Sequence, residues 1–267
     1  MDFHEQFRQT ATESGVPAAE SARFAGLLRF RIRAGGTPGG ARAGRFGGLP
    51  HLPAGTPWPS GLAYLASADC AALPRIAGLA LPETGSLLFF LAAAAAVEAC
   101  SIESEQSLAK VVHVPAGAAT TAVAAPDDLP PPLPERDLFA RVEADLPDWP
   151  DRPAAWWTDD QKQLMADLPH YAELCALVER TWPGRVPWIG DDLVLGGYSV
   201  SAQDSPEEQL AARDPAADEA RMMREWVPLA QFAVPRQDYI HGRFLIRHDD
   251  LAAARFDQAL SFCEFTE

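Results

Sequence analysis

The chain has 267 residues, 48% of them hydrophobic, and a formal net charge of −15 at pH 7. This length allows one large domain or two small ones with a sizeable core. The negative charge would repel phosphate backbones over most of the surface, which argues against nucleic-acid binding. An acidic surface favours solubility and a basic partner, and the alternative, which we favour on charge alone, is a solvated surface with no partner.

The sequence indicates a cytoplasmic protein that does not insert into membranes. No apolar run approaches the roughly 20 residues that a membrane-spanning helix needs. The first residues lack the basic and apolar regions of a signal peptide. Because the four cysteines are widely spaced and form no C-x-x-C pair, we expect free thiols. These cysteines are Cys70, Cys100, Cys175 and Cys263.

Residues 2–26 are expected to be helical, with a break at residues 15–17, where Gly and Pro occur. The next residues alternate strictly, which predicts a strand with one apolar face and one arginine face. The apolar face carries Leu28, Phe30 and Ile32, and the other carries Arg29, Arg31 and Arg33. We interpret the arginine face as solvated and paired with carboxylates; the alternative is a stripe that binds anions or carboxylates.

Residues 34–61 are rich in Gly and Pro and are predicted to form an ordered loop or a series of turns. Within them Trp58 lies between two prolines, whose fixed φ angles would hold the indole in one pose. We favour a loop residue pinned to the core over an anchor for a ligand or partner. Strands are expected at residues 62–66, 85–91 and 110–114.

The later part of the chain combines strands and helices. A strand is expected near residues 138–144, followed by a helix that opens with a capping box at Thr158 and by a second helix at residues 170–181. Residues 204–225 are predicted to form an inserted helix pair that begins at Ser205. The closing strands are expected at residues 226–233, 242–248 and 260–265.

A pattern of three short blocks occurs twice in the same order: a diglycine turn, an apolar strand, and an apolar strand led by Gly. The first copy comprises residues 47–50, 62–67 and 85–90, and the second comprises residues 196–199, 226–231 and 242–247. Fixed-order self-similarity indicates duplicated structure. We therefore expect Gly47-Gly48 and Gly196-Gly197 to occupy equivalent turns, and strands 85–91 and 242–248 to superpose.

The predicted fold is α+β and β-rich, with two related antiparallel-sheet halves produced by internal duplication and a few peripheral helices. Residues 1–125 would form the first half with its leading helix, and residues 135–267 the second. Residues 126–134 form a Pro-rich linker between them. We expect the halves to pack as one compact body.

The sequence carries no recognisable catalytic or cofactor motif. The Gly-rich residues 35–42 lack the Lys-Ser/Thr of a P-loop, and no G-x-G-x-x-G that opens a helix, G-x-S-x-G or H-E-x-x-H sequence occurs. The six histidines are scattered without the spacing of metal ligands. We therefore predict no catalytic residue, no cofactor and no metal.

Several blocks resemble the YwqG-like proteins, a bacterial family with a domain of unknown function. The similar residues are 46–53, 56–59, 62–74 and 81–90, then 195–198 with Gln203, and finally 229–231, 242–246, 250–251 and Phe256. The resemblance covers residues 25–265 and implies a β-rich fold of two similar halves, with no established activity or cofactor. It also implies an immunity role against bacterial toxins for some members. This chain departs from the family at Ser67, where Gln is usual, and at residues 239–242, where the family carries a Trp-Gly-Asp-like turn.

The leading hypothesis is a non-enzymatic binding protein with a basic protein partner, such as an immunity-type protein that neutralises a basic toxin. Complementary charge would speed association. The expected contact is the inserted acidic segment, and the alternative for that segment is a solvated helix pair. Its acidic residues are Glu207, Glu208, Asp214, Asp218 and Glu219.

The runner-up hypothesis is a small-ligand-binding protein or an enzyme that uses a cleft between the two halves. The ligand-binding candidates are Arg31, His51, Trp58 and Gln203. A purely structural subunit is the third reading. The sequence leaves the partner, the ligand and the oligomeric state open.

Overall fold

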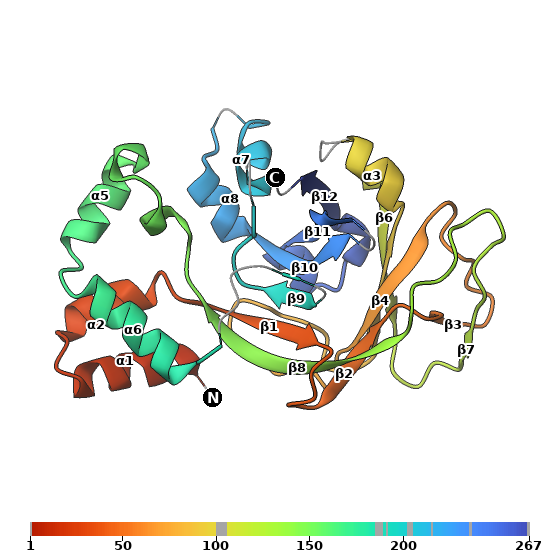
Figure 1. The fold of residues 1–267 in the computed structure, drawn as a ribbon, viewed down its shortest axis with the longest axis horizontal. Helices are drawn as coiled ribbons and strands as arrows, with labels where there is room; N and C mark the ends of the chain where they lie inside the picture. Colours follow the sequence, from red (N-terminus) through yellow and green to blue (C-terminus); the bar gives the residue numbers. More distant parts are fainter. Residues whose placement is uncertain are drawn as a thin grey trace. The chain divides into compact units, whose positions relative to one another are not determined.

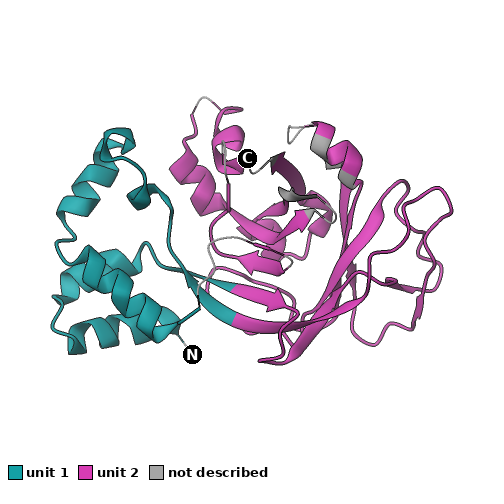
Figure 2. Cartoon of the chain, in the orientation of Figure 1, with its two compact units in different colours: residues 1–31, 142–186 teal, residues 32–141, 187–267 magenta. Residues whose placement is uncertain are grey.

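The computed structural model describes residues 2–99, 106–184, 189–190, 192–201, 205–214, 216–234 and 237–265. The chain divides into two compact units (Figure 2). Unit 1 comprises Met1–Arg31 and Val142–Val186, and unit 2 comprises Ile32–Arg141 and Pro187–Glu267. Each unit draws residues from both sides of the Pro-rich segment 126–134.

Unit 1 is mainly helical. Its helices are α1 (Phe3–Glu13), α2 (Ala18–Ala25), α5 (Asp159–Ala166) and α6 (Tyr171–Thr181), with short 3-10 turns η2 (Trp149–Asp151) and η3 (Ala154–Trp156). The predicted break separates α1 from α2, and the predicted capping box at Thr158 opens α5. Aromatic rings build the core: Phe24 stacks on Phe7 with centroids 5.2 Å apart and contacts Tyr171 at 5.6 Å.

A large antiparallel sheet dominates unit 2 (Figure 1). Its strands are β1 (Arg29–Gly35), β2 (Arg42–Phe46), β4 (Ala63–Asp69), β5 (Ser86–Leu91), β6 (Ala109–Val114), β8 (Arg136–Asp145), β9 (Leu193–Gly196), β10 (Trp226–Val234), β11 (Gln237–Arg247) and β12 (Leu260–Phe265). They follow the order β12-β11-β10-β9-β1-β8-β2-β4-β5-β6. Residues 29–31 of β1 and 142–145 of β8 belong to unit 1. The β-rich, helix-bearing class predicted from the sequence is thus confirmed.

The sheet contains two meanders on either side of the central strands β1 and β8. The first meander is β2-β4-β5-β6 and the second is β9-β10-β11-β12. A β-bulge interrupts β4 at Leu65, between the pairs Tyr64–Phe90 and Ala66–Phe89. A bulge interrupts β10 in the same way at Leu229, between the pairs Pro228–Leu245 and Ala230–Phe244. Bulges locally bend a strand and raise its twist.

Both diglycine sequences lie at the end of the first strand of a meander. Gly47 and Gly48 follow β2 with φ angles of 69° and 72°, and Gly196 and Gly197 end β9 with φ angles of 76° and 79°. Only glycine adopts this left-handed region without steric cost. The diglycine pattern in the sequence therefore identified two tight turns.

The inner faces of the two meanders meet in the core of unit 2. The ring of Phe89 on β5 lies 5.4 Å from that of Phe244 on β11, which in turn contacts Phe232 at 5.6 Å. All three side chains are buried. Because β5 and β11 are far apart in the strand order, this contact requires the sheet to curve back on itself.

The outer faces of the meanders are covered by different elements. A two-stranded sheet, β3 (His51–Pro53) with β7 (Thr120–Ala122), accompanies the first meander, and Leu52 and Trp58 pack with Leu62 and Phe90 there. The second meander is covered by α7 (Pro206–Ala211) and α8 (Glu219–Glu225), whose Leu210 and Met222 pack against its strands.

The remaining elements are α3 (Ala93–Ala99), α9 (His248–Ala252), η1 (Gln106–Leu108) and η4 (Phe256–Gln258). The sequence did not predict α3, β2, β3, β7 or β9. Helix α3 lies in an Ala-rich stretch without periodicity, and the others are short strands with turn-rich or weakly patterned sequence. None of the helices in the described ranges is long and apolar enough to cross a membrane.

Cys70, Cys175 and Cys263 are not in disulfides, as predicted, and Cys100 lies outside the described residues. Burial raises the pKa of Cys70 to about 11, so this thiol stays protonated near neutral pH.

Candidate functional site

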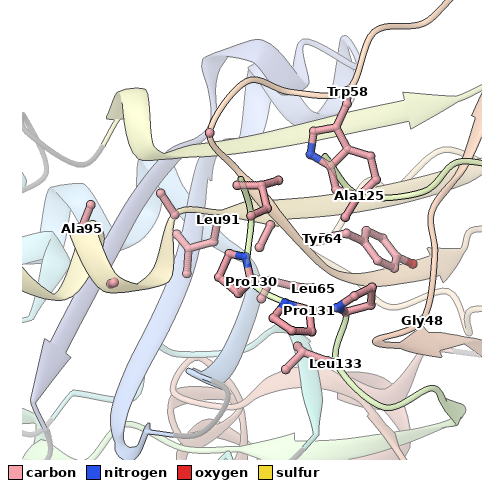
Figure 3. A pocket seen from close by; sticks show the side chains of 16 residues that line it. Gly48, Trp58, Tyr64, Leu65, Leu91, Ala95, Ala125, Pro130, Pro131 and Leu133 are labelled. Atoms are coloured by element: carbon pink, nitrogen blue, oxygen red, sulfur yellow. The ribbon is translucent and has the colours of Figure 1, made fainter. Parts of the chain in front are cut away.

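An apolar cavity of about 390 Å³ opens in unit 2 beside the first meander (Figure 3). Strand β4, helix α3, the loop that carries Trp58 and the Pro-rich segment all contribute to its walls. The lining residues are Gly48, Trp58, Gly61, Ala63, Tyr64, Leu65, Leu91, Ala92, Ala94, Ala95, Ala125, Leu129, Pro130, Pro131, Pro132 and Leu133. We call this space the Trp58 cavity.

Trp58 is held in place by the core while it lines the cavity. Its indole Nε1 donates a hydrogen bond to the carbonyl oxygen of Leu62 at 2.7 Å, and its ring meets the ring of Phe90 edge-on at 5.6 Å. The favoured interpretation of a tryptophan pinned to the core and the alternative of a ligand anchor are therefore compatible. A half-buried, immobilised indole provides contact area without a further loss of side-chain entropy.

The Pro-rich segment is a wall of the cavity and packs along the first meander. Leu133 accepts a hydrogen bond from the backbone N–H of Gly48 at 2.9 Å, and Gly47 donates to the carbonyl of Leu65 at 2.7 Å. A Cβ atom on Gly47 would clash with the carbonyl oxygen of Pro134. The diglycine turn therefore fixes the bulge in β4 and the proline wall at the same time.

Among the described residues that line the Trp58 cavity, Tyr64 is the only one with a titratable side chain. Burial raises its pKa to about 12, although a hydrogen bond with Ser67 and the charge of Arg45 act in the opposite direction. The phenol is therefore neutral near pH 7. Such a wall can bind and orient an apolar group but offers no general base at neutral pH.

A second, polar cavity of about 210 Å³ lies on the outer face of the same meander. Its lining residues are Arg42, Gly44, Arg45, His51, Ser67, Asp69, Ser86, Leu88, Val114 and Thr120. Arg42 Nε lies 2.7 Å from Asp137, and Arg45 Nη1 lies 3.1 Å from Glu135. We call this space the Ser67 cavity.

On the arginine face of β1, Arg31 and Arg33 are buried and Arg29 is half-buried, so the predicted solvated face is wrong. The predicted pairing with carboxylates holds for Arg31 and Arg33. Arg31 and Arg33 are each 1% exposed. Arg31 Nε lies 3.1 Å from Glu143 and its Nη1 lies 3.3 Å from Asp145. Arg33 donates to the carbonyl of Ile189 at 3.0 Å and pairs with Asp192 at 3.2 Å. Period-2 alternation cannot reveal burial on both faces of a central strand.

The four predicted ligand-binding residues are not gathered in one cavity. Trp58 lines the apolar cavity, His51 lines the polar one, and Arg31 lines neither. Gln203 lies outside the described residues. The described residues that line the two cavities all lie between 42 and 133, in the first predicted half and the adjoining Pro-rich segment. Within the described residues, neither cavity is a cleft between the predicted halves.

The acidic segment is in large part structural. Glu207 is 1% exposed and accepts a hydrogen bond from Ser199 Oγ at 2.7 Å, so it is not accessible to a partner. The half-buried Glu219 accepts one from Ser205 Oγ at 2.8 Å. The other three predicted contact residues, Glu208, Asp214 and Asp218, are exposed.

Those exposed carboxylates also serve the two helices. Glu208 completes the capping box of α7 with Ser205, and Asp218 caps α8 by accepting from the N–H of Arg221. Asp214 lies 3.5 Å from Arg221.

A buried polar cluster in the second meander escaped the sequence analysis. Arg243 is fully buried, pairs through Nη2 with Glu264 at 2.6 Å, and donates to the carbonyl of Val200. Gln231 accepts from Val200 N–H and donates to the carbonyl of Tyr198, both at 2.9 Å. The sequence signal for this cluster is a polar residue, Gln231, Arg243 or Glu264, within each of three largely apolar strands.

His241 lies beside this cluster. Its burial, together with the positive charge of Arg243, lowers its pKa. The histidine is therefore neutral at physiological pH.

A family model described as a domain of unknown function, DUF1963, matches residues 44–264. No curated protein matches the chain. The matched range covers all but the ends of the two meanders, the polar cluster, and every described lining residue of both cavities except Arg42. It begins after α1, α2 and β1.

Proposed function

The chain belongs to the DUF1963 family, whose function is not known, and from that premise we propose that it is a non-enzymatic binding protein for a basic protein partner. In this proposal the Trp58 cavity receives a hydrophobic side chain of the partner. The finer resemblance to YwqG-like proteins remains a prediction.

The observation that carries the proposal is the chemistry of the Trp58 cavity. It has about 390 Å³ of space, walls of aromatic, proline and aliphatic side chains, and a single titratable lining group that stays neutral. Cavities of roughly 300–1,000 Å³ with such walls are typical binding sites. Desolvated pockets that bury one large side chain supply much of the affinity in protein interfaces.

Charge supports the choice of a basic partner. The net charge is −15, and Glu208, Asp214 and Asp218 add exposed carboxylates on α7, α8 and the turn between them. Opposite charges accelerate association and make it dependent on salt. We therefore propose that this chain is an immunity-type protein and that its partner is a basic toxin, such as a nuclease, which it neutralises.

We also propose that the two meanders arose by internal duplication. The shared strand order, the bulges at Leu65 and Leu229, and the diglycine turns support this. If the bulges are aligned, Phe89 corresponds to Phe244, so Gly85 and Gly242 are offset by two positions. The sequence predicted that Gly85 corresponds to Gly242. In the proposed duplication, strands β5 and β11 are instead aligned by their pairing register.

The proposed function is tested by calorimetric binding to basic candidate partners, beginning with the products of adjacent genes. Trp58→Ala removes the anchored indole, and we expect a loss of about 2 kcal/mol or more, which is roughly thirtyfold in Kd. Ala95→Phe on α3 fills the cavity from an exposed position and should weaken binding without removing a core residue. Trp156→Ala is the matched control, because Trp156 is 74% exposed and does not line the cavity.

Full affinity in a folded Ala95→Phe variant would exclude the Trp58 cavity from the interface. Turnover of a small substrate, combined with no binding to any adjacent gene product, would overturn the binding-protein proposal.

A further inference from the structure

The Ser67 cavity and the buried polar cluster occupy corresponding positions in the two meanders. After the bulges, Ala66 pairs with Phe89 in the first meander and Ala230 pairs with Phe244 in the second. From there the register has no further shift as far as the pairs Asp69–Ser86 and Ala233–His241. The register of β6 and β12 extends this correspondence. Four residues that line the cavity, Ser67, Ser86, Leu88 and Val114, therefore match Gln231, His241, Arg243 and Glu264.

In the second meander these positions hold large polar side chains. The guanidinium of Arg243 donates to the Glu264 carboxylate and to the carbonyl of Val200. Its Cζ atom lies over the ring of Phe262, 5.2 Å from the ring centroid. The side-chain oxygen of Gln231 accepts a hydrogen bond from the backbone N–H of Val200. Ser201 Oγ donates to Glu264 at 2.7 Å, which closes the cluster.

In the first meander the corresponding side chains are smaller, and about 210 Å³ of space is left. His51 occupies the position that matches Val200, counted from the two diglycine turns, and it lines this space. The place that the Arg243 guanidinium fills in one meander is thus a cavity in the other.

The charges at the Ser67 cavity favour a cationic, donor-rich group. Its two arginines are already compensated, Arg42 by Asp137 and Arg45 by Glu135. Asp69 accepts a hydrogen bond from the backbone N–H of Ala71 at 3.1 Å and has no ion pair among the described residues. Ser67, Ser86 and Thr120 line the same cavity, and their hydroxyls can also accept hydrogen bonds.

We propose that the Ser67 cavity binds the guanidinium group of an arginine side chain. The planar guanidinium carries five N–H donors, which suits one carboxylate surrounded by hydroxyls better than a lysine ammonium does. This inference rests on the proposed function, because it names an arginine of the basic partner as the group that is recognised.

The test is a titration of the full chain with N-acetyl-L-arginine amide, in which NMR chemical shifts of the backbone amides report binding. We expect saturable shifts at Ser67, Asp69, Ser86 and Thr120, and weaker binding of N-acetyl-L-lysine amide. Sodium acetate, an anion of similar size to a carboxylate side chain, should not compete for the cavity.

Two variants address the cavity directly. Ser67→Gln fills it as Gln231 does in the second meander, and Asp69→Asn removes its uncompensated charge. Each should weaken binding of the arginine amide about tenfold or more, the effect of losing a charge-assisted hydrogen bond. Thr121→Val and Asp127→Asn are the controls, since neither residue lines the cavity, and they should leave binding unchanged.

Absence of saturable shifts, equal binding of the lysine amide, or saturable binding of acetate at these residues would overturn the inference. Undiminished arginine binding in both folded cavity variants would do the same. If a basic partner binds the wild-type chain and the Ser67→Gln variant equally, the inference fails while the proposed function stands. Loss of partner binding only in the Ala95→Phe variant would separate the two in the same way.

Discussion

The two meanders of unit 2 have the same strand order and a bulge at the corresponding place, yet their outer faces are covered and filled differently. The second is covered by α7 and α8, and Gln231, Arg243 and Glu264 fill the polar part of its outer face. The first is covered by the β3–β7 pair and the Trp58 loop, and its small side chains leave two cavities. The same strand order can therefore carry an outer face that large polar side chains fill and one whose smaller side chains leave cavities.

The largest expected effect is the loss of the buried ion pair in the second meander. Glu264→Ala leaves the Arg243 guanidinium buried and uncompensated, which should lower the free energy of unfolding by about 3–5 kcal/mol. Urea-induced unfolding measures this change. The double variant Arg243→Met with Glu264→Leu should recover most of it, because apolar residues can replace a buried pair at little cost.

The matched control is Asp148→Ala, which breaks the exposed Arg152–Asp148 pair in unit 1. It should cost less than about 1 kcal/mol. A Glu264→Ala cost as small as that of the control would mean that the cluster does not stabilise the second meander.

The diglycine turns test whether the two meanders share backbone requirements. Gly47→Ala forces a left-handed φ on alanine and brings its Cβ against Pro134, so a loss of about 3 kcal/mol in unfolding free energy is expected. Gly196→Ala should cost at least the backbone part, about 1–2 kcal/mol.

Gly55→Ala provides the comparison, since its φ is 80° but its Cβ would meet open space. It should cost only about 1 kcal/mol. Equal costs at Gly47 and Gly55 would show that the close approach to the proline wall does not constrain the first turn.

Reciprocal substitutions sharpen the comparison of the outer faces. Gln231→Ser removes two hydrogen bonds to the segment after β9 and opens a cavity, and should cost about 2 kcal/mol in thermal or urea unfolding. Ser67→Gln adds the missing side chain to space that is already present, and should leave stability within about 1 kcal/mol of the wild type, in the stabilising direction. If both changes destabilise equally, the two positions are not counterparts.

The smallest expected effect is a pH dependence in unit 1, where His170 donates its backbone N–H to Glu20 at 2.7 Å and places Nδ1 2.8 Å from the same carboxylate. Hydrogen bonding to Glu20 raises the pKa of His170. Burial raises the pKa of Glu20, but the side-chain and backbone hydrogen bonds of His170 outweigh it and the net pKa is lowered.

The pair therefore stabilises the fold most between the two titrations. Its contribution declines as the pH rises through the raised pKa of His170, and declines as the pH falls through the lowered pKa of Glu20. In the wild type the thermal unfolding midpoint should fall as the pH rises above 6.5. In His170→Gln this fall should be smaller, as measured by thermal unfolding between pH 5.5 and 8.5. A wild-type midpoint that does not fall over this side would contradict the coupling.

Local features of the fold were predictable from the sequence. The capping boxes at Thr158 and Ser205 marked helix starts, alternation marked β1, and the diglycines marked two left-handed turns. These signals depend on residues within a few positions of each other. The sequence also singled out Trp58 between its two prolines, and the structure pins its indole by a hydrogen bond to Leu62 and a ring contact with Phe90.

Burial and register were decided by the tertiary structure. Arg31 and Glu207 occupy positions that read as solvated, yet both are 1% exposed because distant segments cover them. The offset between Gly85 and Gly242 follows from the pairing of whole strands, which no short motif contains. The cavities depend on side chains between residues 42 and 133 that only the folded sheet brings together. The sequence by itself determined helix starts, several strands and the two diglycine turns, because these depend on neighbouring residues. Long-range packing decided which outer face is filled by polar side chains and which leaves cavities.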